Sequence, residues 1–351
     1  MRIGICTRYI HSEATYVALR LATWARDRGY EVSLFSPTKT QATIVANWDT
    51  VIHTTQGLAF GDWLRAQDVV LWTHTPSCSQ LTQVQRAGRV AMLFCLWHSL
   101  QQQDYEVYQQ ADYVLSPSYA TTRFLERQWQ LPRVLTVPLD PDLPLSSKPT
   151  TGDACRLFLP LFDELALQRE ATILTILSRV LAAFPQTQLV VAYNSATLAP
   201  FAKQRLLRLT RQFTHRVVLR RAVPYAHRPL LFQAAELSLW PATAENTGWW
   251  PLTSLAAGTP VLAFDVPPIR EYLSAENGIL VPCTQEKSRL GIPVAVPYFE
   301  RYEQALHTVL RDSQQLSQLT QHVGTRLKYR KTAFHASLNR LFTDGPLALL
   351  E

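Results

Sequence analysis

The sequence contains little glycine and no long apolar run. Twelve glycines in 351 residues fall below the usual share of about 7%, so its loops are expected to be stiffer than average. No apolar run reaches the roughly 18 residues that a membrane-spanning helix needs. With 47% hydrophobic and 17% charged residues, the chain is also unlike disordered, collagen-like or coiled-coil proteins.

Cysteines are few and show no metal-binding or disulfide pattern. The five are Cys6, Cys78, Cys95, Cys155 and Cys283. They are odd in number and none forms a C-x-x-C pair, which argues against a disulfide framework and against a zinc site. We interpret all five as small buried hydrophobic residues.

The first ten residues lack the apolar stretch of a signal peptide, because Thr7 and Arg8 interrupt them early. We therefore expect no cleaved signal peptide. A cytoplasmic location is expected, with peripheral attachment to the inner face of the membrane as a variant of it.

Positive charge is concentrated in the second half of the chain. The net charge is +7, and residues 1–150 hold 13 Lys and Arg against 12 Asp and Glu, leaving 21 against 15 for residues 151–351. Much of the excess lies between Lys203 and Arg228, a stretch without acidic residues. It indicates either an anionic partner, such as nucleic acid or an anionic membrane surface, or an ordinary solvated helix face.

Strand and helix patterns alternate along the chain. A short apolar run at residues 2–6 precedes a helical pattern that ends at Arg28 and Gly29, and a second strand is expected at Val32–Phe35. Such alternation predicts parallel sheets with helices on both faces. Further strands are predicted at Val69–Trp72, Val90–Leu96, Tyr113–Leu115, Val134–Val137, Leu157–Leu159, Leu189–Ala192, Val217–Leu219, Leu237–Trp240, Val261–Phe264 and Ile279–Val281.

One proline-rich segment, Leu139–Gly152, interrupts this alternation and is the predicted interdomain linker. We therefore predict an α/β protein with two doubly wound, Rossmann-like domains that face each other across a cleft. The predicted bounds are 1–145 and 153–325, followed by a helical segment, 326–351, that packs back toward the first domain. Ligands of such folds bind at the carboxyl ends of the strands.

The segment Leu237–Pro282 has the strongest functional pattern. A predicted strand leads into a loop with Glu245 and Gly248, and Pro251 then suits the first turn of a helix. Free N–H groups and the positive end of the helix dipole would form an anion site there. Gly248 would let the backbone approach a ligand closely.

This segment resembles the donor-binding region of glycosyltransferase family 4, which has the GT-B fold. The family pattern runs E-x-F-G-x-x-P-x-E-A-x-A-x-G-x-P-V, followed by D-x-G-G-x-x-E and G-x-L-V. The chain matches it at Glu245, Gly248, Pro251, Ala256, Gly258, Pro260, Val261, Asp265, Glu271, Gly278, Leu280 and Val281. A second block, Ala111–Pro138, resembles the last strands and helix of the family's N-terminal domain.

The chain also departs from the family. Its E-x(7)-E pair is Glu245 and Thr253, so one carboxylate that binds the nucleotide ribose is replaced by a hydroxyl with fewer hydrogen bonds to offer. The family's Gly-Gly is replaced by Pro267-Pro268. The family's diphosphate-binding basic pair has no clear counterpart, since Leu161 and Phe162 stand near the first position and Arg169 near the second. For Arg169 the alternative is a surface arginine at the start of a helix.

The resemblance implies roles for several residues. Glu245 would contact sugar hydroxyls, with capping of the following helix as the alternative. His98 would face the transferred sugar, with a hydrogen-bonded core histidine as the alternative. Glu13 and His11 are candidates for proton transfer. Arg169, Asn246, Thr247, Gly248, Trp249, Trp250 and Thr253 are assigned to the donor nucleotide-sugar, with one of the tryptophans packed in the core and the other free to stack on a sugar or base.

No metal is expected at the site. Asp140-Pro-Asp142 spells the D-x-D metal signature of the other main glycosyltransferase fold, but it lies in the predicted linker. We therefore interpret it as structural, and expect helix dipole and basic side chains to stabilise the leaving diphosphate.

The resemblance implies an enzyme that moves a sugar, most simply a hexose, from a nucleotide-sugar to an acceptor with retention of configuration. A UDP-sugar is the expected donor, with a GDP-sugar as the alternative, and no further cofactor is expected. The acceptor would be a glycan, a lipid-linked sugar or a metabolite. Two alternatives stay open: a DNA-modifying glycosyltransferase of the phage type, and a catalytically silent GT-B subunit that binds a partner or a nucleotide.

Overall fold

The chain forms two compact units. The computed structural model describes residues 1–7, 13–36, 53–54, 59–96, 100–143, 155–162, 170–193, 198–224, 227–245, 247–288, 290–343 and 347. Unit 1 comprises Met1–Asp140, Leu290–Ile292 and Arg330–Glu351, and unit 2 comprises Pro141–Arg289 and Pro293–Tyr329. Among the described residues, no helix combines the length and the apolar character needed to cross a membrane.

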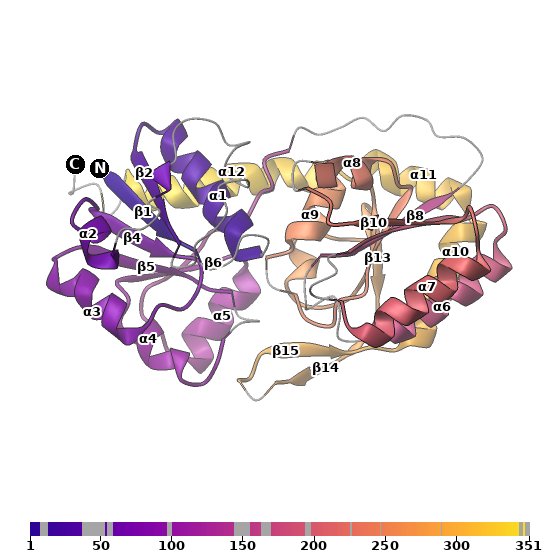
Figure 1. Ribbon diagram of the computed structural model, residues 1–351, viewed down its shortest axis with the longest axis horizontal. Coiled ribbons are helices and arrows are strands. Elements are labelled where there is room, and N and C mark those ends of the chain that lie inside the picture. The colour runs from indigo at the N-terminus through magenta and orange to yellow at the C-terminus, as the bar shows by residue number, and fades with distance from the viewer. Residues whose placement is uncertain are drawn as a thin grey trace. The chain divides into compact units, whose positions relative to one another are not determined.

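Unit 1 contains a seven-stranded parallel sheet in the order β3-β2-β1-β4-β5-β6-β7. Its strands are β1 Arg2–Cys6, β2 Glu31–Phe35, β3 His53–Thr54, β4 Val69–Trp72, β5 Val90–Phe94, β6 Tyr113–Ser116 and β7 Val134–Thr136. Its helices include α1 Glu13–Asp27, α2 Phe60–Leu64, α3 Cys78–Arg86, α4 Asp104–Gln110 and α5 Tyr119–Gln128 (Figure 1).

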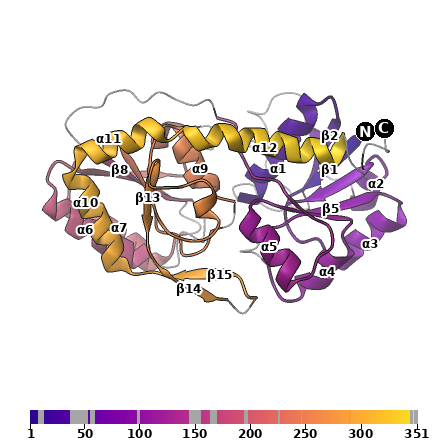
Figure 2. The same cartoon turned by 180° about the vertical axis from the view of Figure 1, so that it is seen from behind.

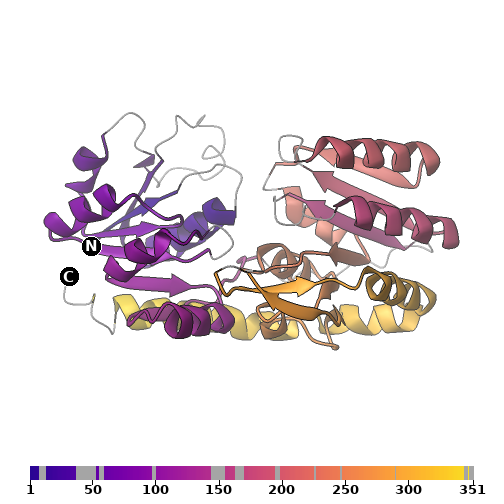
Figure 3. The same cartoon turned by 90° about the horizontal axis from the view of Figure 1, so that it is seen from below.

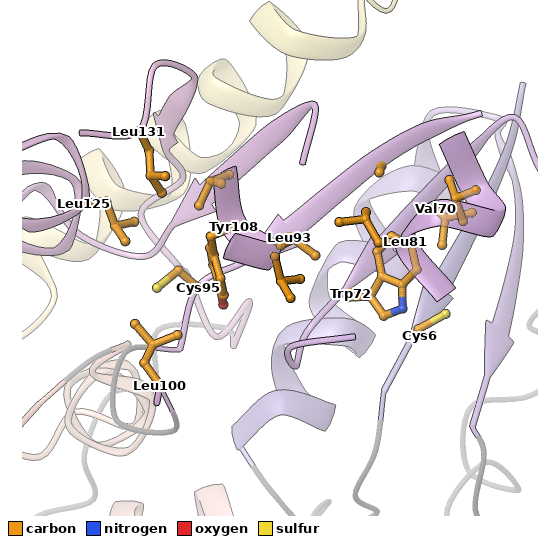
Figure 4. Close-up of a cluster of buried hydrophobic side chains, with 14 of the residues drawn as sticks. Cys6, Val70, Trp72, Leu81, Leu93, Cys95, Leu100, Tyr108, Leu125 and Leu131 are labelled. Atoms are coloured by element: carbon orange, nitrogen blue, oxygen red, sulfur yellow. The ribbon is translucent and has the colours of Figure 1, made fainter. Parts of the chain in front are cut away.

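The central strands of unit 1 are buried on both faces because helices cover the sheet. All four residues of β4 are buried, as are the last four of β5. Figure 4 shows part of the core that they form, where Trp72, Leu93 and Leu125 are fully buried. Continuous apolar runs of this kind are what a parallel sheet with two covered faces requires.

Unit 2 contains a six-stranded parallel sheet in the order β10-β9-β8-β11-β12-β13. Its strands are β8 Arg156–Leu161, β9 Gln188–Tyr193, β10 Val217–Arg221, β11 Leu237–Trp240, β12 Val261–Phe264 and β13 Gly278–Val281. The helices of this half are α6 Glu170–Ala183, α7 Pro200–Gln212, α8 Arg228–Gln233, α9 Trp249–Ala256, the 3₁₀ turn η5 Ile269–Glu271, α10 Phe299–Arg311 and α11 Ser313–His322 (Figures 2 and 3). Helix α12, Thr325–Phe342, begins in unit 2 and belongs to unit 1 from Arg330 onward.

The two parallel α/β sheets confirm the predicted fold class. The strands predicted at Val69–Trp72, Leu237–Trp240 and Val261–Phe264 agree with the structure residue for residue. An antiparallel pair, β14 Thr284–Lys287 and β15 Pro293–Val296, was not predicted. All four residues of β14 are exposed, so the sequence shows no apolar alternation there.

The cysteine interpretation is wrong for three of the five residues. All five are free thiols; Cys6 and Cys95 are buried, Cys155 and Cys283 are half-buried, and Cys78 is exposed. Burial raises the pKa of the Cys95 thiol far above its ordinary value, so Cys95 stays a neutral core residue.

Each sheet reverses its strand order once. In unit 1 the reversal lies between β1 and β4, and in unit 2 between β8 and β11. Loops that leave the carboxyl ends of such neighbouring strands diverge to opposite faces, which opens a crevice where ligands of doubly wound sheets bind. In unit 2 this point is flanked by Phe162, which follows β8, and by the loop that carries Glu245 after β11.

Candidate functional site

Glu245 is held firmly in the loop between β11 and α9. Its Oε2 accepts a hydrogen bond from Trp240 Nε1 at 2.6 Å, and its Oε1 accepts one from the Gly248 backbone N–H at 2.8 Å. The residue is only 6% exposed. A carboxylate has about four lone-pair positions, and Glu245 uses both of its oxygens to fix this loop.

The start of α9 has fewer N–H groups for an anion than the sequence suggested. The Gly248 N–H donates to Glu245, and the Trp249 N–H donates to Thr247 Oγ1 at 3.1 Å. Pro251 has no N–H, although its place in the first turn is as predicted. The interpretation of a helix start with free N–H groups is therefore wrong for Gly248 and Trp249.

Position 248 needs a glycine, both for its backbone conformation and for the close approach of a neighbouring ring. It has φ +69° and ψ 20°, the left-handed region that favours glycine. A Cβ at this position would lie 2.5 Å from ring carbons of Tyr272. The close approach predicted for Gly248 is thus made to Tyr272 of the protein itself.

Changing Gly248 to alanine should lower the free energy of unfolding by about 2–4 kcal/mol, because the methyl group adds a left-handed strain and a steric clash. Chemical denaturation of the purified variant measures this loss. The matched control is Gly61→Ala, since a Cβ at Gly61 meets nothing closer than 3.9 Å. Equal stability of the two variants would contradict the strain at Gly248.

Both tryptophans of α9 are buried. Trp249 is 3% and Trp250 is 2% exposed. The Trp250 ring packs 4.7 Å from the Phe162 ring and is stacked on Phe232 at 6.4 Å between centroids. The prediction that one tryptophan stays available to stack on a sugar or base is therefore wrong for this structure.

Thr253 occupies the place of the second family glutamate and is used inside the helix. It is 3% exposed, and its hydroxyl donates to the Trp249 carbonyl at 2.7 Å. The hydroxyl proton is thus committed, and only the oxygen lone pairs of Thr253 remain for a ribose.

Arg228 brings a cation to the position where the sequence showed none. Its guanidinium carbon lies 4.3 Å from the centroid of Phe162 and 5.1 Å from that of Trp250, and the residue is 5% exposed. Its Nε donates to the Val223 carbonyl at 3.2 Å. No sequence pattern indicates this contact, because Arg228 is 66 positions away from Phe162 in the chain and lies within a general basic stretch.

Arg216, a second arginine of the stretch between Lys203 and Arg228, also makes contacts inside the fold. Arg216 donates to the carbonyls of Thr187, Leu181 and Phe184 at 3.1, 2.8 and 2.6 Å. Together with buried Arg228, it shows that the stretch is not one uniform solvated face.

Beyond α9, the segment that replaces the family's Gly-Gly forms a compact turn. Pro267 and Pro268 lead into η5, and Arg270 makes a two-bond ion pair with Asp265. These bonds raise the pKa of the Arg270 guanidinium, and burial raises the pKa of the Cys283 thiol beside them.

Unit 1 contributes two of the predicted residues. Glu13 begins α1, where a carboxylate suits the positive end of the helix dipole. Asp140, the first residue of the D-x-D pattern, forms a buried ion pair with Arg20. In the part of the chain that the structure describes, no cluster of three or more His, Cys, Asp or Glu residues is placed to hold a metal ion.

Four predicted residues, namely His11, His98, Arg169 and Asn246, lie outside the described residues. Their assignments stay predictions.

Residues 171–289 match the model of the family described as Glycosyl transferases group 1. These residues are a group 1 glycosyltransferase domain. The matched segment includes Glu245, Gly248, Thr253 and Arg228, whereas Phe162 and Glu13 lie outside it.

Solved structures match the chain over its length at low identity. A glycosyltransferase from Rickettsia africae ESF-5 is 8% identical with a TM-score of 0.72, covering 98% of each chain. The sucrose-phosphate synthase of Thermosynechococcus elongatus is 14% identical with a TM-score of 0.73, covering 100% of each chain. Anabaena HepE, solved with UDP and glucose, is 14% identical with a TM-score of 0.73, covering 97% of this chain and 99% of its own.

No curated protein matches the chain in sequence. The GT-B fold therefore rests on the structural likeness, and the family rests on the match over residues 171–289. The match over these residues supports a transferase enzyme with a role in glycosyl transfer.

Proposed function

We propose that the protein transfers a sugar from a nucleotide-sugar, with a UDP-sugar as donor, and that unit 2 holds this donor at the β8/β11 reversal. The observation that carries the proposal is the Glu245 carboxylate, fixed by Trp240 and Gly248 at the start of α9 and within the family-matched segment. HepE and the pneumococcal O-GlcNAc transferase GtfA, which have similar folds, were solved with UDP bound.

Arg228 would bind the donor diphosphate. Its guanidinium lies beside the ring of Phe162, which follows β8 at the carboxyl end of that strand. It also lies beside the ring of Trp250, which is in the first turn of α9. A buried cation meets a diphosphate in a medium of low dielectric constant, where charges interact most strongly. The dipole of α9 adds positive potential at the same edge.

Glycosyl transfer follows from these groups. Negative charge grows on the leaving diphosphate as the bond from its oxygen to the anomeric carbon breaks, and Arg228 with the α9 dipole would stabilise that charge. Glu245 would orient the sugar through its hydroxyls. We propose that the reaction needs no metal ion, because this cationic environment can take its place, and that it retains anomeric configuration as the family resemblance implies.

Unit 1 would hold the acceptor, which we propose to be a glycan, a lipid-linked sugar or a metabolite. The β1/β4 reversal of unit 1 is a switch point of the kind at which doubly wound sheets bind ligands, and Glu13 at the start of α1 lies at this carboxyl edge. Glu13 and His98 are the proposed groups for proton transfer and sugar positioning. We propose a cytoplasmic location for the enzyme.

A comparison of UDP with uridine tests the donor site. UDP should raise the melting temperature of the wild-type protein, since a ligand that binds only the folded state stabilises it. Uridine should do so less. Arg228→Met should remove most of the difference between UDP and uridine, because it removes the charge that recognises the diphosphate.

Arg208→Met is the matched control, because Arg208 is exposed on α7 and should leave the UDP shift unchanged. No shift with UDP, GDP or their sugar conjugates, together with no hydrolysis of any donor, would reject the transferase proposal. That result would favour the silent subunit. A UDP shift that Arg228→Met leaves intact would reject only the role of Arg228.

A further inference from the structure

The longest acid-free part of unit 2 surrounds its edge strand. Residues 171–235 contain nine Lys and Arg and no Asp or Glu. Some of these cations have internal roles: Arg179 pairs with Glu303 of α10, Arg216 binds backbone carbonyls, and Arg228 is buried. The exposed remainder includes Arg208 and Arg211 on α7 and Arg220 and Arg221 at the end of β10.

Helix α7 packs on the sheet with one face only. Ala202, Leu206 and Leu209 are buried at helical spacing and face the core of unit 2. Figure 1 shows α7 beside α6 at the periphery of this unit. The strand next to it, β10, is an edge strand of the sheet.

The outward side of α7 combines large apolar side chains with cations. Phe201 is 56% and Leu207 is 52% exposed, and Arg208 and Arg211 are exposed on the same side of the helix. We call these four residues the α7 face. A surface helix of a globular protein normally places polar residues outward, so two exposed large apolar residues among arginines require an explanation.

The basic end of β10 extends the α7 face. Strands β9 and β10 are parallel, so α7, which connects them, runs antiparallel to β10. The first turn of α7, with Phe201, therefore lies at the same edge of the sheet as Arg220 and Arg221, which end β10.

We propose that the α7 face, together with Arg220 and Arg221, docks unit 2 onto an anionic phospholipid bilayer. Exposed Phe and Leu side chains gain free energy by entering the boundary between headgroups and acyl chains, and arginines beside them bind anionic headgroups. Nucleic acid fits less well, because a phosphate backbone offers Leu207 no apolar surface. This inference does not depend on the proposed donor site.

Vesicle flotation tests the docking surface directly. Wild-type protein should bind vesicles of phosphatidylcholine and phosphatidylglycerol in equal parts, and bind vesicles of phosphatidylcholine alone only weakly. The double change Arg208→Gln with Arg211→Gln should lower the partition coefficient about tenfold or more, since each cation near an anionic surface contributes a several-fold factor. Phe201→Ser with Leu207→Ser should lower it comparably, through lost apolar insertion.

Helix α5 of unit 1 supplies matched controls, because Tyr119 is 59% exposed and Arg123 and Arg127 are also exposed there. Tyr119→Ser, and Arg123→Gln with Arg127→Gln, should leave vesicle binding unchanged. All variants alter exposed side chains, so an unchanged melting temperature verifies that each is folded.

Three results would overturn the proposal: no binding of wild-type protein to the anionic vesicles, binding that is equal on both vesicle types, or an equal loss in the α5 variants. Binding to duplex DNA that is abolished by the Arg208 and Arg211 changes, without vesicle binding, would assign the surface to nucleic acid instead. Self-association removed by the Phe201 and Leu207 changes, again without vesicle binding, would assign it to a second copy of the chain.

Discussion

Replacing Glu245 by glutamine is expected to lower kcat/KM for glycosyl transfer by about 10²-fold or more, because a charged acceptor of sugar hydroxyls is lost where the transition state needs it. The side chain keeps its size, but its NH2 group replaces one of the two oxygens, so either the Trp240 Nε1–H or the Gly248 N–H loses its acceptor. The melting temperature of the variant must therefore be measured beside its activity. Steady-state kinetics with a UDP-sugar that stabilises the wild-type protein measures the effect.

Glu245→Ala is a poorer test, and the structure shows why. The Trp240 Nε1–H and the Gly248 N–H both donate to this carboxylate in a buried setting. Removing the acceptor leaves two buried donors unsatisfied, at about 1–3 kcal/mol each. An alanine variant would therefore lose stability as well as activity.

Trp240→Phe provides the control for Glu245→Gln. It removes one hydrogen bond to the carboxylate but keeps the charge. If Trp240→Phe and Glu245→Gln lower kcat/KM equally, Glu245 acts only by positioning the loop. A much larger loss in Glu245→Gln would place the carboxylate against the donor sugar, and unchanged turnover in Glu245→Gln would remove Glu245 from the mechanism.

Removing Arg20 is expected to destabilise unit 1 by about 3–5 kcal/mol, because it leaves the buried carboxylate of Asp140 without its ion-pair partner. Arg20 Nε donates to the Asp140 carbonyl at 3.0 Å, and Arg20 Nη2 lies 3.4 Å from Asp140 Oδ2. The guanidinium also lies 4.3 Å from the Phe334 ring of α12. Chemical denaturation of Arg20→Met against wild type measures the loss.

Two further variants show whether the loss of stability in Arg20→Met comes from the unpaired charge or from lost packing. Arg26→Met breaks the exposed pair of Arg26 with Asp27 and should cost at most about 1 kcal/mol. The double change Arg20→Met with Asp140→Asn should recover part of the stability, since it removes the buried charge as well. A double variant that is no more stable than Arg20→Met would show that packing on Phe334, not charge, dominates.

The sequence predicted local structure well where one pattern dominates. Val69–Trp72 and Val261–Phe264 are continuous apolar runs, and all their residues are buried in central strands. Strand β14 has no such pattern, because all four of its residues are exposed and it pairs with β15 through backbone hydrogen bonds, which any non-proline residue can form.

For the candidate site, the sequence located the loop but misjudged what its groups do. The spacing of Glu245, Gly248 and Pro251 identified the segment before the structure was known. The burial of Trp249 and Trp250, and the internal hydrogen bonds of Thr253 and the Gly248 N–H, depend on neighbours that the pattern does not specify.

The sequence by itself thus determined the fold class and the family-like segment, because periodicity and spacing act over a few residues at a time. Only the tertiary structure decided that Arg228 reaches Phe162, that Arg20 pairs with Asp140 across 120 positions, and that α7 turns Phe201 outward. Contacts of this kind are set by how distant strands and helices pack, and no local pattern in the chain encodes which distant side chain will occupy a given place.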